Sequence, residues 1–290
     1  MFNHLTNTQK GMLLAFGGYT AFAFSDASVK YVSTLGYSIY QIISVNTALA
    51  CLLMLVFSPL IGGIKSLKDG KNAKVHAARI VLNTSVNLLV VYCFSIMPLA
   101  SVYTAIFTLP FIAALISIPL FGEKIGIHRR ISIVLGFAGI LIAFQPWGVN
   151  FNLFEFLLPV GATVLIAMMF LAARFYKDTS PLAIGFYPVL GCCLLVTPLA
   201  IADFQSIILE HFPFFLISGV FMSLGIIGVS LAFKSTDSAA ITPLLYSEMI
   251  WAILFGVLVF GDYPDSWMLI GAGIIILSGL YLVHRERSNP

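Results

Sequence analysis

Charged side chains are scarce in this sequence. Only 9% of its 290 residues are Asp, Glu, Lys or Arg, whereas 60% are hydrophobic, and the mean hydropathy is +1.01. An ordinary soluble domain carries roughly 25% charged residues, so a water-exposed surface of the usual kind cannot be built from this chain. The apolar residues form long continuous runs rather than a two-residue alternation, which excludes a β-barrel. Membrane-spanning helices are therefore the predicted structure.

Motifs of soluble chemistry are also missing. The four cysteines lie inside apolar runs with no CxxC or Cys/His spacing, so we interpret them as small buried side chains rather than disulfides or metal ligands. The sequence has no GxxxxGK[ST] phosphate loop, no HExxH motif and no nucleophile elbow. We therefore expect no cofactor, no metal and no catalytic residues. A membrane-embedded enzyme and a structural or receptor-like membrane protein remain the less favoured alternatives.

Ten apolar runs have the length of a membrane span. A hydrocarbon core about 30 Å thick takes roughly 20 residues per helix, which leaves only short loops between ten helices. The least distinct divisions fall at Met97–Pro98 and between Lys234 and Asp237. The predicted spans are 12–32, 39–63, 78–97, 99–121, 131–147, 154–173, 182–202, 213–233, 239–260 and 267–283.

The basic residues predict how these helices are oriented. With ten spans, all of the 15 Lys and Arg residues except Lys30 fall on the side of the termini. Under the positive-inside rule this places both termini in the cytoplasm. The basic cluster from Lys65 to Arg79 then reflects orientation, and we expect no nucleic-acid partner. The bilayer itself is the expected surrounding.

The chain contains an internal repeat. Ala100–Glu123 (ASVYTAIFTLPFIAALISIPLFGE) aligns without gaps on Ala239–Asp262 (AAITPLLYSEMIWAILFGVLVFGD) at an offset of 139 residues, and both segments end in Phe-Gly-acid. The first helix of each half aligns at an offset of 144, which pairs Lys30 with Arg174. Five helices per half is an odd number, so the second half must enter the membrane upside down. We predict two inverted repeats, residues 1–150 and 151–290, with a solute site between them near the midplane.

Features of individual helices add to this prediction. Pro110 and Pro243 occur in the two aligned segments, where they can free backbone carbonyls and bend a helix, or simply kink it. The helices that follow are rich in glycine, which permits close helix packing. Those glycines are Gly136, Gly139, Gly271, Gly273 and Gly279.

The two aligned segments resemble the drug/metabolite transporter superfamily, in particular its EamA-type members with two five-helix repeats. The resemblance rests chiefly on Leu109–Glu123 and Ser247–Asp262, with Met249 where Pro is usual and Asp262 where Glu is usual. It implies a carrier of small organic solutes in the bacterial inner membrane, with a central cavity lined by helices 1, 3, 4, 6, 8 and 9. Amino acids, nucleosides or adenosyl compounds and vitamins are the expected solute classes. A lipid or lipid-carrier flippase of the same fold is the alternative.

Two acids inside predicted spans are the first candidate site residues. A charged side chain within a membrane costs about 2.5 to 3.5 kcal/mol on insertion scales, so Asp26 and Glu248 need a functional or structural reason. Glu248 lies about 15 Å along its helix, close to the midplane, and Asp26 lies roughly 21 Å along the first helix. Glu248 aligns with Leu109, and Asp26 aligns with Phe170. This asymmetry favours a role at the solute site, with protons as a candidate coupling ion.

The remaining candidates surround these acids. Lys30 lies four residues after Asp26 on the same helical face, so the two could form an internal ion pair, and Lys30 could also be an end anchor. Asparagine amides on the third helix cannot face lipid cheaply, and aromatic side chains fit a planar or zwitterionic solute, although each aromatic could equally serve helix packing. These further candidates are Tyr19, Asn83, Asn87, Tyr103, Phe107 and Trp251.

Overall fold

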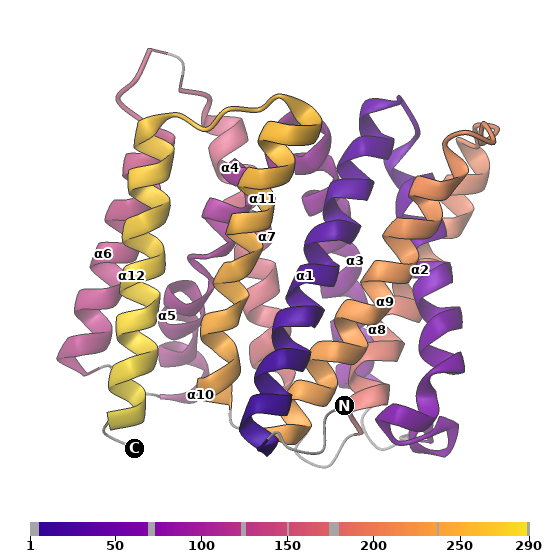
Figure 1. The fold of residues 1–290 in the computed structure, drawn as a ribbon, viewed down its shortest axis with the longest axis horizontal. Coiled ribbons are helices and arrows are strands. Elements are labelled where there is room, and N and C mark those ends of the chain that lie inside the picture. The colour runs from indigo at the N-terminus through magenta and orange to yellow at the C-terminus, as the bar shows by residue number, and fades with distance from the viewer. Residues whose placement is uncertain are drawn as a thin grey trace.

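The protein is a bundle of helices in the computed structural model (Figure 1). The structure describes residues 6–68, 73–122, 126–149, 151–173, 180–236 and 238–288, and these ranges contain no strand. Three residues that entered the sequence argument, Glu123, Arg174 and Asp237, lie outside the described residues. The all-helical prediction is confirmed.

The elements follow the order of the ten predicted spans. The first half has α1 (Asn7–Thr34), α2 (Ile39–Val56), the 3-10 turns η1 (Ser58–Ile61) and η2 (Ile64–Leu67), α3 (Ala73–Ile96), α4 (Leu99–Ile106), α5 (Leu109–Phe121) and α6 (Ile127–Phe144). The second half has α7 (Leu153–Ala173), α8 (Pro181–Ala202), α9 (Phe212–Ser235), α10 (Ser238–Ile241), the 3-10 turn η4 (Thr242–Tyr246), α11 (Ser247–Phe255), the π-helical turn η5 (Gly256–Phe260) and α12 (Ser266–Ser288). The two least distinct divisions of the sequence do separate helices.

Nine helices of the described chain are long and apolar enough to cross a membrane. The tenth predicted span, α1, has 28 residues and reaches about 42 Å at 1.5 Å per residue. It is less apolar than the other nine because the side that faces the rest of the protein is polar, with Ser25, Ser28 and Lys30 all buried. A helix that is enclosed by other helices does not need lipid-facing apolar residues all round, so α1 still serves as a span.

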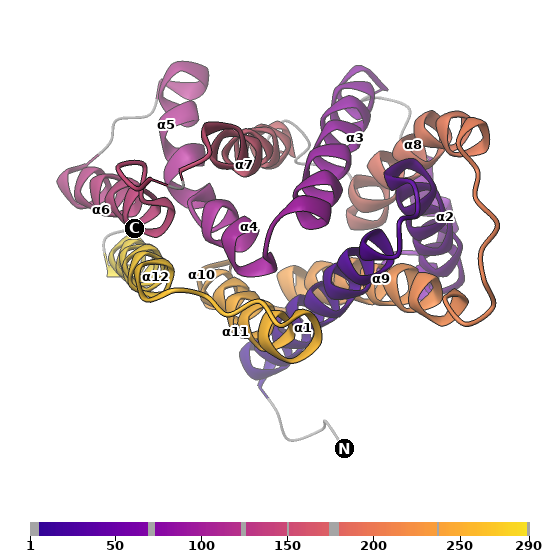
Figure 2. The ribbon, with the colours of Figure 1, turned by 90° about the horizontal axis from the view of Figure 1, so that it is seen from above.

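The two halves are inverted with respect to each other. In Figure 1, α1 begins at the lower face, where α12 also ends, whereas α7 begins at the upper face. The helix contacts are also symmetric between the halves. The contact of α1 with α9 has its equivalent in the contact of α7 with α3, and the equivalent helices α2 and α8, and likewise α6 and α12, pack on each other. Seen from above, helices of the two halves alternate along most of the rim, in the order α5, α7, α3, α8, α2, α9, α1 and α11 (Figure 2). The two-repeat architecture is thus confirmed.

The fourth and ninth predicted elements of this plan differ from simple helices. The span 99–121 is divided into α4 and α5 at Phe107 and Thr108, and the span 239–260 is built from α10, η4, α11 and η5. Each interrupted span has a proline near its break: Pro110 lies in the first turn of α5, just after Phe107 and Thr108, and Pro243 lies in η4, three residues before Tyr246. The offset of 139 aligns Phe107 with Tyr246, and their rings meet edge to face at 5.3 Å. The two breaks therefore touch where the halves meet.

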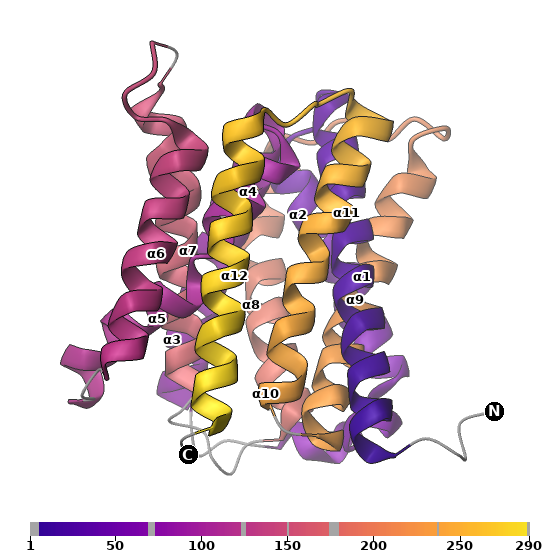
Figure 3. The same ribbon diagram turned by 60° about the vertical axis from the view of Figure 1, so that its left-hand side comes forward.

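Close packing at small residues holds α6 against α12, which lie side by side in Figure 3. A Cβ atom at Gly271 would lie 2.4 Å from the carbonyl oxygen of Gly139. Gly136 faces the ring of Phe111, and Gly279 faces the hydroxyl of Tyr246. The close-packing prediction is confirmed for these four glycines and is wrong for Gly273, which has nothing within 4 Å of its Cβ position.

Candidate functional site between the repeats

Asp26 and Tyr103 join α1 to α4. The Tyr103 hydroxyl donates a hydrogen bond to the Asp26 carboxylate, with 2.6 Å between the oxygens. Ala23 and Ala27, the small neighbours of Asp26 on α1, are 2% and 8% exposed, which lets the helices approach closely. Tyr103 is almost fully buried, whereas Asp26 as a whole residue is half-buried.

Glu248 brings a second carboxyl group to the same place from the other repeat. It lies in the first turn of α11 and is 6% exposed. Its side chain is close enough to interact electrostatically with Asp26, and also with Tyr19 and Tyr103. Two carboxyl groups in one low-dielectric region repel each other when both are ionised. Such a pair can accommodate a proton or a cationic group.

A row of aromatic rings continues from this pair through the centre of the protein. Phe94 lies 6.3 Å from Tyr103, Tyr103 lies 5.7 Å from Phe107, and Phe107 lies 5.3 Å from Tyr246, all measured between ring centroids. Phe107 is fully buried, so here it acts as packing between the repeats. Tyr103 and Phe107 were both candidates from the sequence, and the structure brings both rings to the interface between the repeats.

Trp251 connects α11 to α1 through a hydrogen bond and ring contacts. Its indole N–H donates to the Thr20 hydroxyl at 3.1 Å, and its ring stacks on Phe255 at 5.8 Å. Phe24 packs against the same two rings, with centroids at 5.7 Å and 4.8 Å. Sequence reasoning missed Thr20, because a single threonine in an apolar helix carries no signal of its partner.

The polar side chains of α3 bind backbone of α8. Pro188 has no N–H, which leaves the carbonyl of Ile184 without its helical partner, and Arg79 donates to this oxygen at 3.0 Å. The Asn83 amide donates to the carbonyl of Pro188 at 3.1 Å, and Asn87 donates to the carbonyl of Asn83 at 2.9 Å. The amide nitrogens of Asn83 and Asn87 thus serve helix packing and helix geometry, and the solute contact proposed for these two residues stays a prediction.

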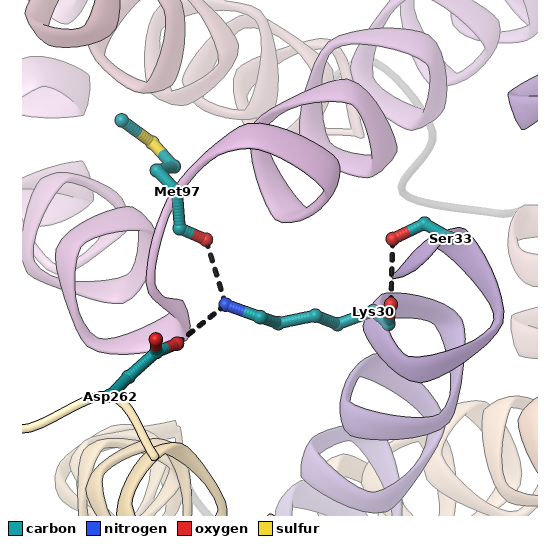
Figure 4. A network of polar contacts seen from close by, with 4 residues as sticks. All are labelled: Lys30, Ser33, Met97 and Asp262. Carbon is teal, nitrogen blue, oxygen red and sulfur yellow. Dashed lines mark hydrogen bonds and ion pairs between the residues drawn. The ribbon is translucent and has the colours of Figure 1, made fainter. Parts of the chain in front are cut away.

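Lys30 and Asp26 do not form the internal ion pair that the sequence allowed. The Lys30 ammonium lies 2.7 Å from a carboxylate oxygen of Asp262 and donates to the carbonyl of Met97 at 3.0 Å (Figure 4). It also lies 4.8 Å from the centroid of the Phe260 ring. The i, i+4 spacing was compatible with pairing, but Asp26 is held by Tyr103 and the long Lys30 side chain extends away to another element. Asp262 had been noted only as a loop acid and motif residue.

These features define a class: a multi-pass helical membrane protein of two inverted repeats, with ionisable groups from both repeats gathered between them. Comparison with known proteins gives the family. The model of the EamA-like transporter family matches residues 9–145 and again residues 153–284, so the chain belongs to this family. The earlier family resemblance is confirmed.

Named relatives transport different small molecules. A riboflavin transporter of Vibrio cholerae is 32% identical over 190 residues, a stretch that spans 60% of this chain and 62% of that protein. An S-adenosylmethionine uptake transporter of Rickettsia bellii is 26% identical over 68% of this chain and 67% of its own length. A transporter of Helicobacter pylori without an assigned solute is 24% identical over 93% of this chain and 91% of its own length.

One solved structure has the same fold. It superposes with a TM-score of 0.68 at 14% sequence identity and covers 97% of this chain and 99% of its own. At this level of identity the likeness concerns the fold alone. The family membership and the named relatives together support transport of a small metabolite.

Proposed function

We propose that the protein is a secondary transporter that moves a small organic solute by alternating access, with Asp26 and Glu248 at the polar centre of the solute site. The observation that carries this proposal is that two carboxyl groups from opposite repeats lie within electrostatic range of each other, and that one of them accepts a hydrogen bond from Tyr103. In inverted-repeat carriers, solute and coupling ion bind near the midplane between the repeats. The origin of the two carboxyl groups in opposite repeats supports placing the solute between those repeats.

The chemistry of the pair favours a solute with a cationic or amine-bearing group. Carboxylates accept hydrogen bonds and attract cations, and both effects are stronger where water is excluded. The rings of Tyr19 and Tyr103 lie beside the pair and suit contact with a planar group. Solutes of the named relatives, riboflavin and S-adenosylmethionine, are therefore the first compounds to test, with protons as the proposed coupling ion.

The distribution of basic residues supports a cytoplasmic location for both termini in the inner membrane. The face where α1 begins and α12 ends is then internal, and the face that carries Asp262 is external. This orientation is used below, where the two faces are called inner and outer.

The test begins with a thermal-shift screen of the purified protein against amino acids, nucleosides, vitamins and adenosyl compounds. A compound that stabilises the protein is then followed into liposomes containing it, with and without a pH gradient. We expect Asp26→Asn and Glu248→Gln each to lower its binding and uptake strongly. Glu155→Gln is the matched control, because Glu155 lies near the start of α7 and is bound to Asn152.

Equal binding and uptake by wild type and both site variants would refute the assignment of the carboxyl pair. Movement of labelled lipid across the same liposomes, without saturable uptake of any solute, would replace the proposal with the flippase alternative. Uptake that requires no pH gradient and is unaffected by collapsing one would refute proton coupling while leaving the solute site intact.

A further inference from the structure

The Lys30–Asp262 ion pair joins the two repeats at the outer face. Lys30 comes from α1 in the first repeat, and Asp262 follows η5 in the second repeat, 232 residues away in the sequence. The Lys30 side chain is 7% exposed, so its charge is enclosed by protein, while Asp262 is 29% exposed. Figure 4 shows the extended Lys30 side chain crossing from α1 to both partners.

Both partners of the Lys30 ammonium lie in the junctions between helices. Met97, whose carbonyl accepts from Lys30, lies between α3 and α4, and Asp262 lies in the short linker between η5 and α12. The N–H of Asp262 donates to the carbonyl of Gly256 at 2.8 Å, which fixes the start of that linker. Backbone at such junctions can change direction without breaking a regular helix.

The ion pair lies above the proposed solute site. Lys30 is four residues after Asp26 on α1, which places it about 6 Å further toward the outer face. A pocket of about 250 Å³ surrounds it and is lined by Lys30 and Asp262 together with residues of the α3–α4 junction. An adjoining pocket of about 510 Å³ shares Met97 and Pro98 with it.

We propose that Lys30 and Asp262 form the outer gate of the transporter: their contact holds the repeats together above Asp26 and must separate before the site opens outward. This role differs from the solute contact that the sequence suggested for Lys30. It rests on the proposed function, because it takes Asp26 to be part of the solute site.

The surroundings of the pair suit a contact that forms and breaks. A fully enclosed ion pair is costly to separate, because each charge would remain without water. Here the partly exposed Asp262 can be hydrated as it leaves, and the released ammonium of Lys30 faces a pocket large enough to hold water. The Phe260 ring, 4.8 Å from the Lys30 ammonium, provides a further contact only in the closed arrangement.

The test measures access to the site directly and needs no solute. In a background with the four native cysteines replaced by alanine, Ala23→Cys reports on the face of α1 one turn inside Asp26. The protein is reconstituted in liposomes, and the rate of labelling by a membrane-impermeant maleimide is measured from the outer side. Molecules in the reverse orientation are excluded by prior labelling of a cysteine placed at Lys10 with a second impermeant reagent.

Neutralising the gate should open the path to the reporter. We expect Lys30→Gln and Asp262→Asn each to raise the labelling rate by about tenfold, an effect between that of an exposed ion pair and that of a fully buried one. Lys30→Asp combined with Asp262→Lys should restore the slow rate. Asp265→Asn is the matched control, because this nearby outer acid bonds to Gln145 and caps α12 instead.

Two results would overturn the proposal. One is a wild-type labelling rate in both neutral variants, each shown by size-exclusion chromatography to be folded. The other is an equal increase in Asp265→Asn, which would indicate general loosening. If Asp262→Asn does not fold, the labelling rate of Lys30→Gln alone tests the proposal. Lys30→Gln leaves only the Asp262 carboxylate unpaired, and this group is partly exposed to water. A failed gate with solute binding intact would leave the proposed function standing.

Discussion

Adding one methyl group at Gly271 should weaken the contact between α6 and α12, whereas adding it two residues later should not. A Cβ atom at Gly271 would lie 2.4 Å from the carbonyl oxygen of Gly139 and 2.6 Å from the backbone nitrogen of Ala143. Ordinary contact begins at 3.4 Å, so the two helices would have to separate locally by about 1 Å (3.4 minus 2.4). Gly273 on the same helix has nothing within 4 Å of its Cβ position.

Comparing the stability of the two alanine variants isolates the cost of the clash between α6 and α12. Replacing Gly by Ala inside a helix gains about 0.5–1 kcal/mol from helix propensity, and this gain applies equally to both positions. Overpacking costs about 1–3 kcal/mol, and here the obstructing atoms are backbone, which cannot rotate away. Gly271→Ala should therefore be less stable than Gly273→Ala by about 1–3 kcal/mol.

Thermal unfolding in detergent, followed by intrinsic fluorescence, measures this difference. At about 2 °C per kcal/mol for a chain of this size, the midpoints should differ by about 2–6 °C, with Gly273→Ala at or above wild type. Equal midpoints for the two variants would show that the packing argument for α6 and α12 is mistaken. So would a lower midpoint for Gly273→Ala alone.

Two other contacts give predictions that rest on pairs of substitutions. Gly279→Ala places a Cβ atom against the Tyr246 hydroxyl, so this substitution should lower the unfolding midpoint. Adding Tyr246→Phe removes that hydroxyl and should recover part of the loss. No recovery would contradict this contact. Arg79→Gln should cost about 1–3 kcal/mol of stability, because it weakens the bond to the carbonyl of Ile184. The cost should fall when Pro188→Ala restores a backbone N–H for that carbonyl, and an unchanged cost in the double variant would refute the pairing.

The overall plan of the fold was predictable because membrane insertion leaves a strong trace in sequence. Apolar runs, basic residues concentrated in alternate loops and the repeated Phe-Gly-acid ends together predicted ten spans in two inverted halves. The breaks inside two spans were indicated by Pro110 and Pro243, but their position at Phe107 and Tyr246 was not. A proline reports that a helix is interrupted nearby, and packing between the halves decides where.

The candidate site was predictable as a set of residues and unpredictable as a set of contacts. Asp26 and Glu248 are visible because a carboxyl group in an apolar run is rare. The partner of Lys30 lies 232 residues away, so its identity depends on which helix ends meet in the folded protein. The sequence did carry one signal of this contact: Lys30 is the exception to the positive-inside pattern, and a lone basic residue near the outer face needs an acidic partner there. Asp262 is such an acid.

The polar stripe of α3 shows a second limit of reading one helix at a time. Buried amides on a membrane helix indicate a polar partner, and a solute cavity was the partner we inferred. In the folded protein one such partner is the backbone of α8: Arg79 binds the carbonyl of Ile184, which Pro188 leaves without a helical donor, and Asn83 binds the carbonyl of Pro188. Both Asn83 and Pro188 are visible in the sequence, but only the packing of α3 on α8 connects them.

Symmetry and asymmetry have different roles in this molecule. The contact of Phe107 with Tyr246, which are equivalent positions, marks where the two repeats meet and gives both halves the same break. The acids do not follow this symmetry, because Glu248 has Leu109 as its equivalent. A symmetric scaffold can adopt two related conformations of similar energy, while an asymmetric pair of carboxyl groups creates one polar centre rather than two. One centre reached from alternate sides is what transport of a single solute requires.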